Sequence, residues 1–274
     1  MFVTSGAARL AVDVTGAPDG PPVLMLHASV SDSRSWSPLA EALGPGVRAI
    51  AVDRRGFGLT AYAPEPHSDV DDTVAVVDAL GVGAAAVVGA SRGGLLALDL
   101  ALAHPDRVSA LVLISPGVRG APVLVPDSPA LEALDLAIQA AEEAGDLDEV
   151  NRLEAQVWLD GPHAPAGRVT GPVRDLFLDM NGIALAAADP GPPADAPPAW
   201  DRLDDVTVPT LVLVGDLDVP DDVARADALG ERLPQAEVRH LGGTAHLPHL
   251  EPHPACLPAI TSFLAAAGAL GSRP

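Results

Sequence analysis

The sequence predicts an α/β protein in which helices cover both faces of a mostly parallel, doubly wound sheet of about eight strands. Three observations lead to this fold class. Strand-like runs alternate with helical patterns along the chain, and the middle runs are almost continuously apolar. Such runs are typical of parallel strands that are buried on both faces. A length of 274 residues is also sufficient for one large domain with a well-buried core.

Each element has its own local signal. A helix is expected after Ser68, because Ser68 and Asp71 form a capping box and an apolar stripe follows from Val70 to Leu80. The stretch after Ser91 is apolar on nearly every face, which indicates a buried helix. The predicted strands are residues 8–14, 23–27, 47–53, 84–90, 108–115, 210–216 and 237–243.

The alternation of strands and helices stops between residues 117 and 200. This segment has no strand-like run, carries amphipathic patterns at 146–160 and 172–188, and ends in a proline-rich connector at 190–200. We therefore predict a helical insertion (residues 117–200) that forms a lid over the carboxyl edge of the sheet. Residues 1–116 and 201–274 would form the core domain.

The charge balance restricts the partners. The sequence has 37 acidic and 16 basic residues, so its net charge is −21, and every basic residue is an arginine. A chain this acidic repels phosphate backbones and anionic lipids, and we expect neither nucleic acid nor a membrane as partner. The absence of lysine, with abundant Ala, Gly and Pro, fits either a GC-rich genome or adaptation to high salt.

The chain carries no pattern of an exported or membrane-spanning protein. No apolar stretch of 18 residues lacks charges, and the first residues resemble a strand rather than a secretion signal. The single cysteine, Cys256, excludes an internal disulfide and is typical of a reducing compartment. We expect a cytoplasmic protein that acts on a small molecule, and the sequence indicates no particular oligomeric state.

The run Gly89-Ala90-Ser91-Arg92-Gly93 fits the pattern G-x-S-x-G between a predicted strand and a predicted helix. A sharp turn at this place would expose the hydroxyl of Ser91 at the top of the sheet, and the flanking glycines would leave room for the turn. Backbone N–H groups at the helix N-terminus could then meet a developing oxyanion. The alternative is that Ser91 only caps the helix.

A nucleophilic serine needs a base and an acid that orients the base. His246 lies in a glycine-rich turn after the last predicted strand, where catalytic groups gather in open α/β sheets. Asp216 and Asp218 both follow strand 210–216, and either could be the acid or a solvated turn residue. The order Ser…Asp…His is the order that this triad takes on one class of α/β sheet.

His246, His249 and His253 could also be considered as a metal cluster. No acidic or Cys ligand joins them at a usual spacing, and the neighbouring prolines would break a helix that could hold them together. We therefore expect no metal, and the chemistry of a serine triad requires no organic cofactor.

The motifs together resemble the α/β-hydrolase superfamily over nearly the whole chain, specifically the lidded bacterial serine esterase and lactonase branch with 3-oxoadipate enol-lactonase-like hydrolases. The resemblance implies that Asp218 rather than Asp216 is the acid, that His246 is the base, and that the lid follows the sixth strand. The matching runs are LMLHAS (24–29), VDRRGFGLT (52–60), VVGASRGG (87–94), HPDRVSALVLISP (104–116), VPTLVLVGDLDVP (208–220) and GGTAHLPHLEPHP (242–254).

The same resemblance places the oxyanion hole at the backbone N–H groups of Ser29 and Arg92. This chain has Ala28 where relatives usually have glycine, which alters the backbone freedom of that loop. By the same resemblance His27 supports the loop, and Arg54 and Arg55 hold the neighbouring one.

The implied activity is hydrolysis of carboxylic ester or lactone bonds of a small substrate through Ser91, His246 and Asp218. A serine at this position excludes the halide- and epoxide-opening branches, which use aspartate. An enol-lactonase, a C–C bond hydrolase or a perhydrolase could use the same triad. A binding protein that has kept the fold without turnover is the alternative from another class.

Substrate contacts are the least determined part of the prediction. The candidates for lining an acyl pocket are Trp158, Phe177, Met180 and Trp200, although each could be ordinary core. The side chain of Arg92 is a cation at a helix N-terminus, where positive charge is unfavourable. This position suggests either an acidic partner or an anionic group of the substrate.

Overall fold

The computed structural model describes residues 1–271. Its strands are β1 (Phe2–Ser5), β2 (Ala8–Thr15), β3 (Pro22–Leu26), β4 (Arg48–Val52), β5 (Ala61–Tyr62), β6 (Ala85–Ala90), β7 (Val108–Ile114), β8 (Thr210–Gly215) and β9 (Ala236–Leu241). Its α-helices are α1 (Ser37–Leu43), α2 (Asp69–Ala79), α3 (Arg92–Ala103), α4 (Pro129–Ala144), α5 (Leu147–Ala155), α6 (Pro172–Leu185), α7 (Pro220–Arg232) and α8 (Cys256–Ala266). Short helical turns are η1 (Ser33–Trp36), η2 (Pro105–Arg107), the π-helical η3 (Gln156–Asp160) and η4 (Trp200–Asp205).

The strands form one sheet in the order β1-β2-β4-β3-β6-β7-β8-β9, and β5 pairs with β2. Neighbouring strands pair in parallel from β4 through β3, β6, β7 and β8 to β9. The pairs β1–β2, β2–β4 and β2–β5 are antiparallel. The predicted fold class is confirmed, and all seven predicted strands are present. The described residues add β1 and the two-residue β5, which is too short to leave a periodic pattern. The helical insertion follows β7, which is the seventh strand of the chain when the two-residue β5 is counted and the expected sixth strand when it is not.

Helices cover both faces of the sheet because the strands are apolar on both faces. Every residue of β6 and β8 is buried. In β7, Leu111 and Leu113 belong to a core shared with α2, α3 and α7, whereas Val112 and Ile114 point into a second core shared with α1 and α8. One half of the predicted capping box is present, since the Ser68 hydroxyl accepts a hydrogen bond from the Asp71 N–H at the start of α2.

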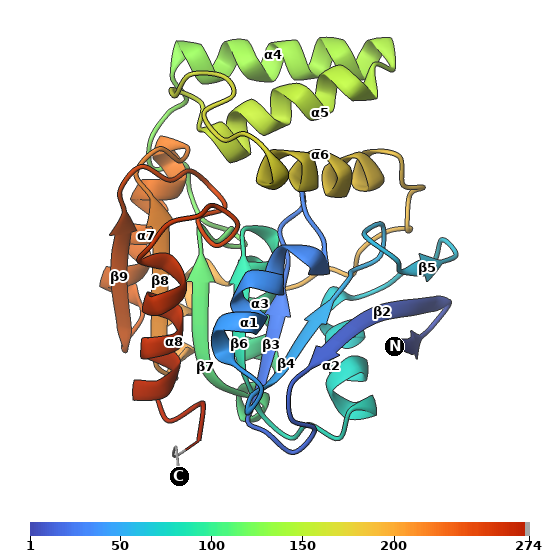
Figure 1. The fold of residues 1–274 in the computed structure, drawn as a ribbon, viewed down its shortest axis with the longest axis vertical. Helices are drawn as coiled ribbons and strands as arrows, with labels where there is room; N and C mark the ends of the chain where they lie inside the picture. The colour runs from blue at the N-terminus through green and yellow to red at the C-terminus, as the bar shows by residue number, and fades with distance from the viewer. Residues whose placement is uncertain (272–274) are drawn as a thin grey trace.

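The helices α4, α5 and α6 are stacked above the carboxyl ends of the strands, with α6 nearest the sheet (Figure 1). The amphipathic pattern at 146–160 forms α5 and η3, and the second pattern forms α6. Leu131 and Val157 pack against Val219 in the loop after β8, which fixes the insertion on the core. No helix among the described residues is long and apolar enough to cross a membrane.

Candidate functional site

Ser91 occupies a strained turn between β6 and α3. Its backbone has φ 51° and ψ −115°, a region that residues with a side chain rarely adopt. The Ser91 N–H donates to the carbonyl of Ile114 at 2.8 Å, which ties the turn to the neighbouring strand. Ser91 is the N-cap residue of α3 by position, but its side chain makes no capping hydrogen bond, so the alternative that the hydroxyl serves only to cap the helix is wrong.

Two glycines allow this turn. A Cβ atom at Gly89 would overlap with the carbonyl oxygen of Gly93, and a Cβ atom at Gly93 would overlap with the carbonyl oxygen of Leu26 in β3. Both contacts are with backbone, which cannot move aside without shifting a strand or the helix. The glycines of the motif therefore have the spatial role that the sequence predicted.

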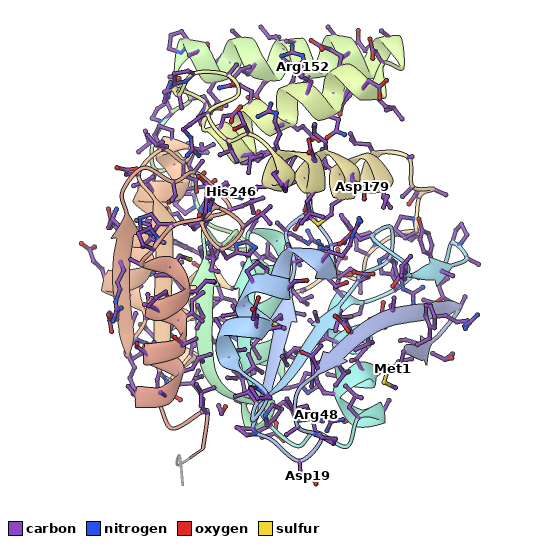
Figure 2. The ribbon with its side chains drawn as sticks, in the orientation of Figure 1. Met1, Asp19, Arg48, Arg152, Asp179 and His246 are labelled. Carbon is purple, nitrogen blue, oxygen red and sulfur yellow. The ribbon has the colours of Figure 1, made fainter. Side chains whose placement is uncertain are left out.

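His246 lies at the same edge of the sheet, facing the helical insertion (Figure 2). Its Nδ1 atom lies 2.9 and 3.0 Å from the two carboxylate oxygens of Asp218, and both side chains are buried. Asp216 does not contact His246. Its side chain is exposed, and its carboxylate accepts a hydrogen bond from the Gly243 N–H at 2.6 Å. Of the two aspartates, only Asp218 contacts the histidine.

A second carboxylate approaches His246 from the first turn of α7. Asp222 Oδ2 lies 3.5 Å from His246 Nδ1, and Asp222 also pairs with Arg225. Asp222 was not predicted from the sequence. Its only local signal is a helix start four residues after Asp218, and acidic residues at a helix start are common.

The protonation of His246 depends on these neighbours. Burial lowers its pKa, but the charge and hydrogen bond of Asp218, with the charge of Asp222, more than offset this effect and raise the pKa above its ordinary value. Burial raises the pKa of Asp222, while the charge of His246 opposes this shift. Within residues 1–271, one group of side chains could hold a cation, because one ligand atom from each of Asp218, Asp222 and His246 lies within 4.8 Å of the others.

The loop after β3 is organised around His27. His27 Nδ1 donates to the Ala28 carbonyl at 2.7 Å, and its Nε2 accepts from the Arg54 N–H at 3.1 Å. Burial, together with the charge of Arg54, holds the pKa of His27 well below its ordinary value, so the ring is neutral. Ser29 is exposed, and within residues 1–271 neither its N–H nor that of Arg92 donates a hydrogen bond to the protein.

The side chain of Arg92 has an acidic partner. Its Nη2 atom lies 3.4 Å from Asp69 Oδ2, and the buried Arg54 lies 3.7 Å from the same oxygen. Burial and the nearby positive charge of Arg92 lower the pKa of Arg54 to about 10, although the negative charge of Asp69 acts in the opposite direction.

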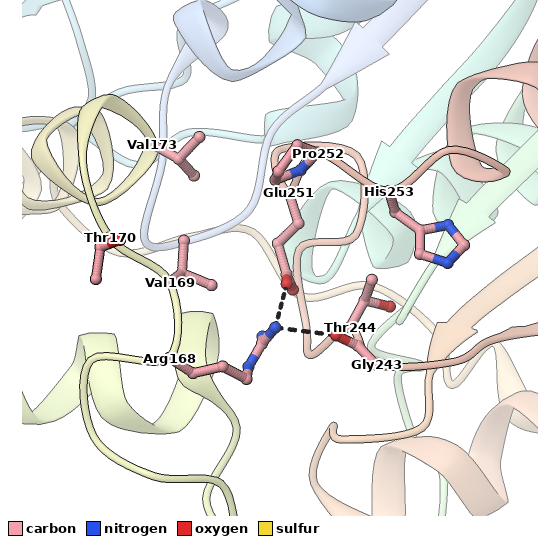
Figure 3. A pocket seen from close by; sticks show the side chains of 9 residues that line it. All are labelled: Arg168, Val169, Thr170, Val173, Gly243, Thr244, Glu251, Pro252 and His253. Atoms are coloured by element: carbon pink, nitrogen blue, oxygen red, sulfur yellow. Dashed lines mark hydrogen bonds and ion pairs between the residues drawn. The ribbon is translucent and has the colours of Figure 1, made fainter.

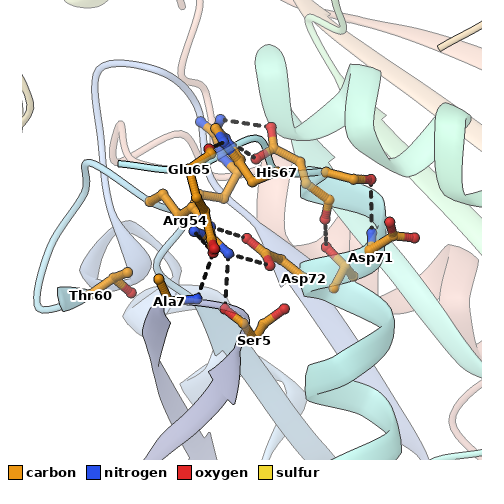
Figure 4. A network of polar contacts seen from close by, with 12 residues as sticks. Ser5, Ala7, Arg54, Thr60, Glu65, His67, Asp71 and Asp72 are labelled. Atoms are coloured by element: carbon orange, nitrogen blue, oxygen red, sulfur yellow. Dashed lines mark hydrogen bonds and ion pairs between the residues drawn. The ribbon is translucent and has the colours of Figure 1, made fainter. Parts of the chain in front are cut away.

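Arg55 contacts Asp72, Glu65 and the Ser5 carbonyl, each within 2.9 Å, and Figure 4 shows the polar network to which these three partners belong. The arginine therefore holds the loop after β4, as expected.

The aromatic candidates have different surroundings. The ring of Trp158 lies 4.7 Å from the ring of His246, whereas Phe177 and Met180 are fully buried in the core below α6. Trp200 packs against Arg232 and the opposite core, away from His246. His249 stacks on Trp36 at 4.3 Å, and burial with the charge of His246 lowers its pKa to about 3.

Sequence and structure comparisons identify the family. Residues 23–257 match the model of the alpha/beta hydrolase family. The chain belongs to the alpha/beta hydrolase family. It is therefore a hydrolase, and the predicted resemblance to this superfamily is confirmed.

Individual relatives differ in their chemistry. A putative carbamate hydrolase of Caulobacter segnis is 29% identical over 83% of this chain and 85% of its own length. A 2-(acetamidomethylene)succinate hydrolase of Mesorhizobium japonicum is 27% identical over 93% of this chain and 92% of its own length. A thermophilic esterase from Thermogutta terrifontis, solved with malate bound, has a TM-score of 0.74 and 27% identity over 97% of this chain and 98% of its own.

Proposed function

We propose that the chain is a serine hydrolase that cleaves carboxylic ester or lactone bonds of a small substrate through Ser91, His246 and Asp218. The observation that carries the proposal is the strained backbone of Ser91 at the sheet edge where the buried Asp218 contacts His246. A strain of this kind persists where the surrounding structure enforces it, and it is characteristic of catalytic turns.

In the proposed reaction His246 takes the proton from the Ser91 hydroxyl while its oxygen attacks the substrate carbonyl. Asp218 receives the Nδ1–H hydrogen bond, which leaves Nε2 as the proton acceptor and stabilises the imidazolium that forms. His246 then gives the proton to the departing alcohol. A water molecule, deprotonated by the same histidine, releases the acid from Ser91.

The N–H groups of Ser29 and Arg92 are the proposed donors to the tetrahedral oxyanion. Both lack protein acceptors in the described chain, which leaves them available to a substrate oxygen. Loss of one such donor typically reduces turnover by about 10²–10³-fold. The helical insertion, which lies over this edge, would act as the lid.

The similarity to the esterase of Thermogutta terrifontis supports an ester substrate. The names of two other relatives, a putative carbamate hydrolase and a 2-(acetamidomethylene)succinate hydrolase, give the competing substrates for the assay. The enol-lactonase alternative was prompted by Arg92 as a partner for a substrate carboxylate, and Asp69, whose Oδ2 lies 3.4 Å from Arg92 Nη2, competes for that role. The cytoplasmic location and the lack of nucleic-acid and membrane partners stay predictions from the net charge of −21 and the single cysteine.

The test is a panel of p-nitrophenyl esters of increasing acyl length, small lactones and carbamates, with fluorophosphonate labelling of the folded protein. We expect labelling at Ser91 and a loss of turnover of at least about 10⁴-fold in Ser91→Ala.

Asp218→Asn should lower kcat by about 10⁴-fold, because the imidazole loses its oriented tautomer. Asp216→Asn is the matched control and should retain activity. Activity in Ser91→Ala, or equal effects of the two Asn variants, would refute the assignment, and a fully inert, unlabelled protein would favour a binding role.

A further inference from the structure

The side chain of Arg168 joins the helical insertion to the loop that carries His246 (Figure 3). On the insertion side, Nε donates to the carbonyl of Asp160 and Nη2 to that of Leu159, both at 2.7 Å. On the other side, Nη1 lies 2.9 Å from the Gly243 carbonyl and 2.7 Å from Glu251 Oε2. One guanidinium group therefore binds acceptors from two segments that are far apart in sequence.

Glu251 continues this connection to His246. Its side chain is 4% exposed, and its second oxygen accepts a hydrogen bond from the N–H of Ala245 at 2.8 Å. Ala245 directly precedes His246. Because a buried carboxylate is costly without a cation, the ion pair with Arg168 and the position of this loop depend on each other.

The carbonyls of Leu159 and Asp160, which Arg168 binds on the insertion side, lie at the end of the π-helical turn η3, and this turn also carries Trp158. The indole ring of Trp158 is tilted by 51° against His246 at a centroid distance of 4.7 Å. After this turn, Gly161 packs against the carbonyl of Leu217, where a Cβ atom would overlap. The turn is thus fixed against both the acid loop and the histidine loop.

We propose that Arg168 is a positioning residue that, with Glu251, holds Trp158 against His246 and thereby limits the size of the substrate group that departs beside His246. The size limit rests on the proposed function, because only then does His246 protonate a leaving group. The planar guanidinium is suited to this task, since it presents several donors in fixed directions. A lysine could keep the charge opposite Glu251 but could not bind all four acceptors.

The chain offers a matched control in Arg174. It has the same partial exposure as Arg168, 20% against 21%, and it binds Asp160 Oδ2 at 2.9 Å and the Val169 carbonyl at 3.3 Å. All of its partners lie within the insertion. Arg174→Gln therefore weakens the insertion without cutting its connection to the His246 loop.

The first measurement is tryptophan fluorescence between about pH 5 and pH 9, which needs no activity. A protonated imidazole in contact with an indole quenches its emission, so protonation of His246 should quench Trp158. Trp36 contacts His249, whose pKa is about 3 and lies outside this range, and Trp200 contacts Arg232. We expect the acid quench in the wild type and in Arg174→Gln, and its loss in His246→Gln and Arg168→Met.

The second measurement is the ratio of kcat/KM for bulky against small alcohol leaving groups on the same acyl chain. Arg168→Met should raise this ratio by about 10-fold, mainly through a higher kcat/KM for the bulky leaving groups, and Arg168→Lys should give an intermediate value. Circular dichroism confirms folding, and Arg168→Lys takes over the test if Arg168→Met does not fold.

The proposal is overturned if Arg168→Met keeps the acid quench, if the ratio does not change, or if Arg174→Gln has the same effects. These outcomes are separate from a failure of the proposed function. The acid quench tests the contact between Trp158 and His246, and it can be measured even in a protein without Ser91-dependent turnover. The kcat/KM ratio for bulky against small leaving groups tests whether that contact limits the size of the leaving group.

Discussion

His246 is the residue whose chemistry depends most on its immediate surroundings. Burial alone would favour the neutral ring, yet Asp218 and Asp222 on its Nδ1 side raise its pKa above the ordinary value. The more distant carboxylate, Asp222, is shared with Arg225, so its charge is partly neutralised within the protein. Two carboxylates therefore raise the pKa of His246, and only that of Asp218 accepts a hydrogen bond from it.

We expect Asp222→Asn to shift the acid limb of kcat/KM to lower pH. Turnover needs the neutral imidazole, so activity falls as the pH drops through the raised pKa of His246. Removal of the Asp222 charge lowers this pKa and extends activity to more acidic pH. The pH–rate profile measures the shift. Asp227→Asn is the control in the same helix, because Asp227 pairs with His240 instead. A shift to higher pH would contradict the assignment.

The junction of β6 and α3 shows how one element fixes a functional turn. The strand is buried at every residue, and the helix that follows packs so closely that Gly93 lies against the backbone of Leu26 in β3. The close approach of α3 to β3 leaves room only for a sharp turn at Ser91 between β6 and α3. The strain of this turn is therefore held by the packing of two regular elements.

Gly93→Ala should lower the free energy of unfolding by about 1–3 kcal/mol and reduce turnover at the same time. The added methyl group overlaps with the Leu26 carbonyl, so α3 must move away from β3. Denaturant unfolding and kcat/KM measure the two effects. Gly83→Ala, in the loop before β6, meets no atom within 4 Å and should stay within about 0.5 kcal/mol of the wild type. Equal losses in the two variants would rule out the steric explanation.

At the scale of the whole molecule, the dominant property is an excess of negative charge. The 37 acidic residues face only 16 arginines, and several arginines are engaged in buried contacts such as Arg55 with Asp72. The remaining carboxylates repel one another across the surface, which destabilises the compact state at low salt.

We expect Tm to rise as NaCl increases from about 0.02 to about 0.5 M, because the Debye length falls from about 20 Å to about 4 Å and the repulsion is screened. Thermal unfolding by circular dichroism measures the change. Near pH 4.4, where the sequence carries no net charge, the same salt step should have a much smaller effect. A flat or falling Tm at pH 7 would show that the excess charge does not limit stability.

Local patterns in the sequence predicted the seven main strands, the helix cap at Ser68 and the glycine-flanked turn at Ser91. These features depend on residues within one turn or strand, so periodicity and spacing carry them. The pattern did not reveal β5, which has two residues, or Asp222, whose role depends on the position of α7 relative to His246.

Patterns along the chain were enough to predict the fold class and the order of the candidate groups. The contact of Asp218 with His246, the pairing of Arg92 with Asp69 and the ion pair of Arg168 with Glu251 became visible only in the folded molecule. Each of these contacts joins side chains from separate loops or helices, and Arg168 and Glu251 are 83 residues apart. Such partners are chosen by the packing of elements in space, and no local periodicity records that packing.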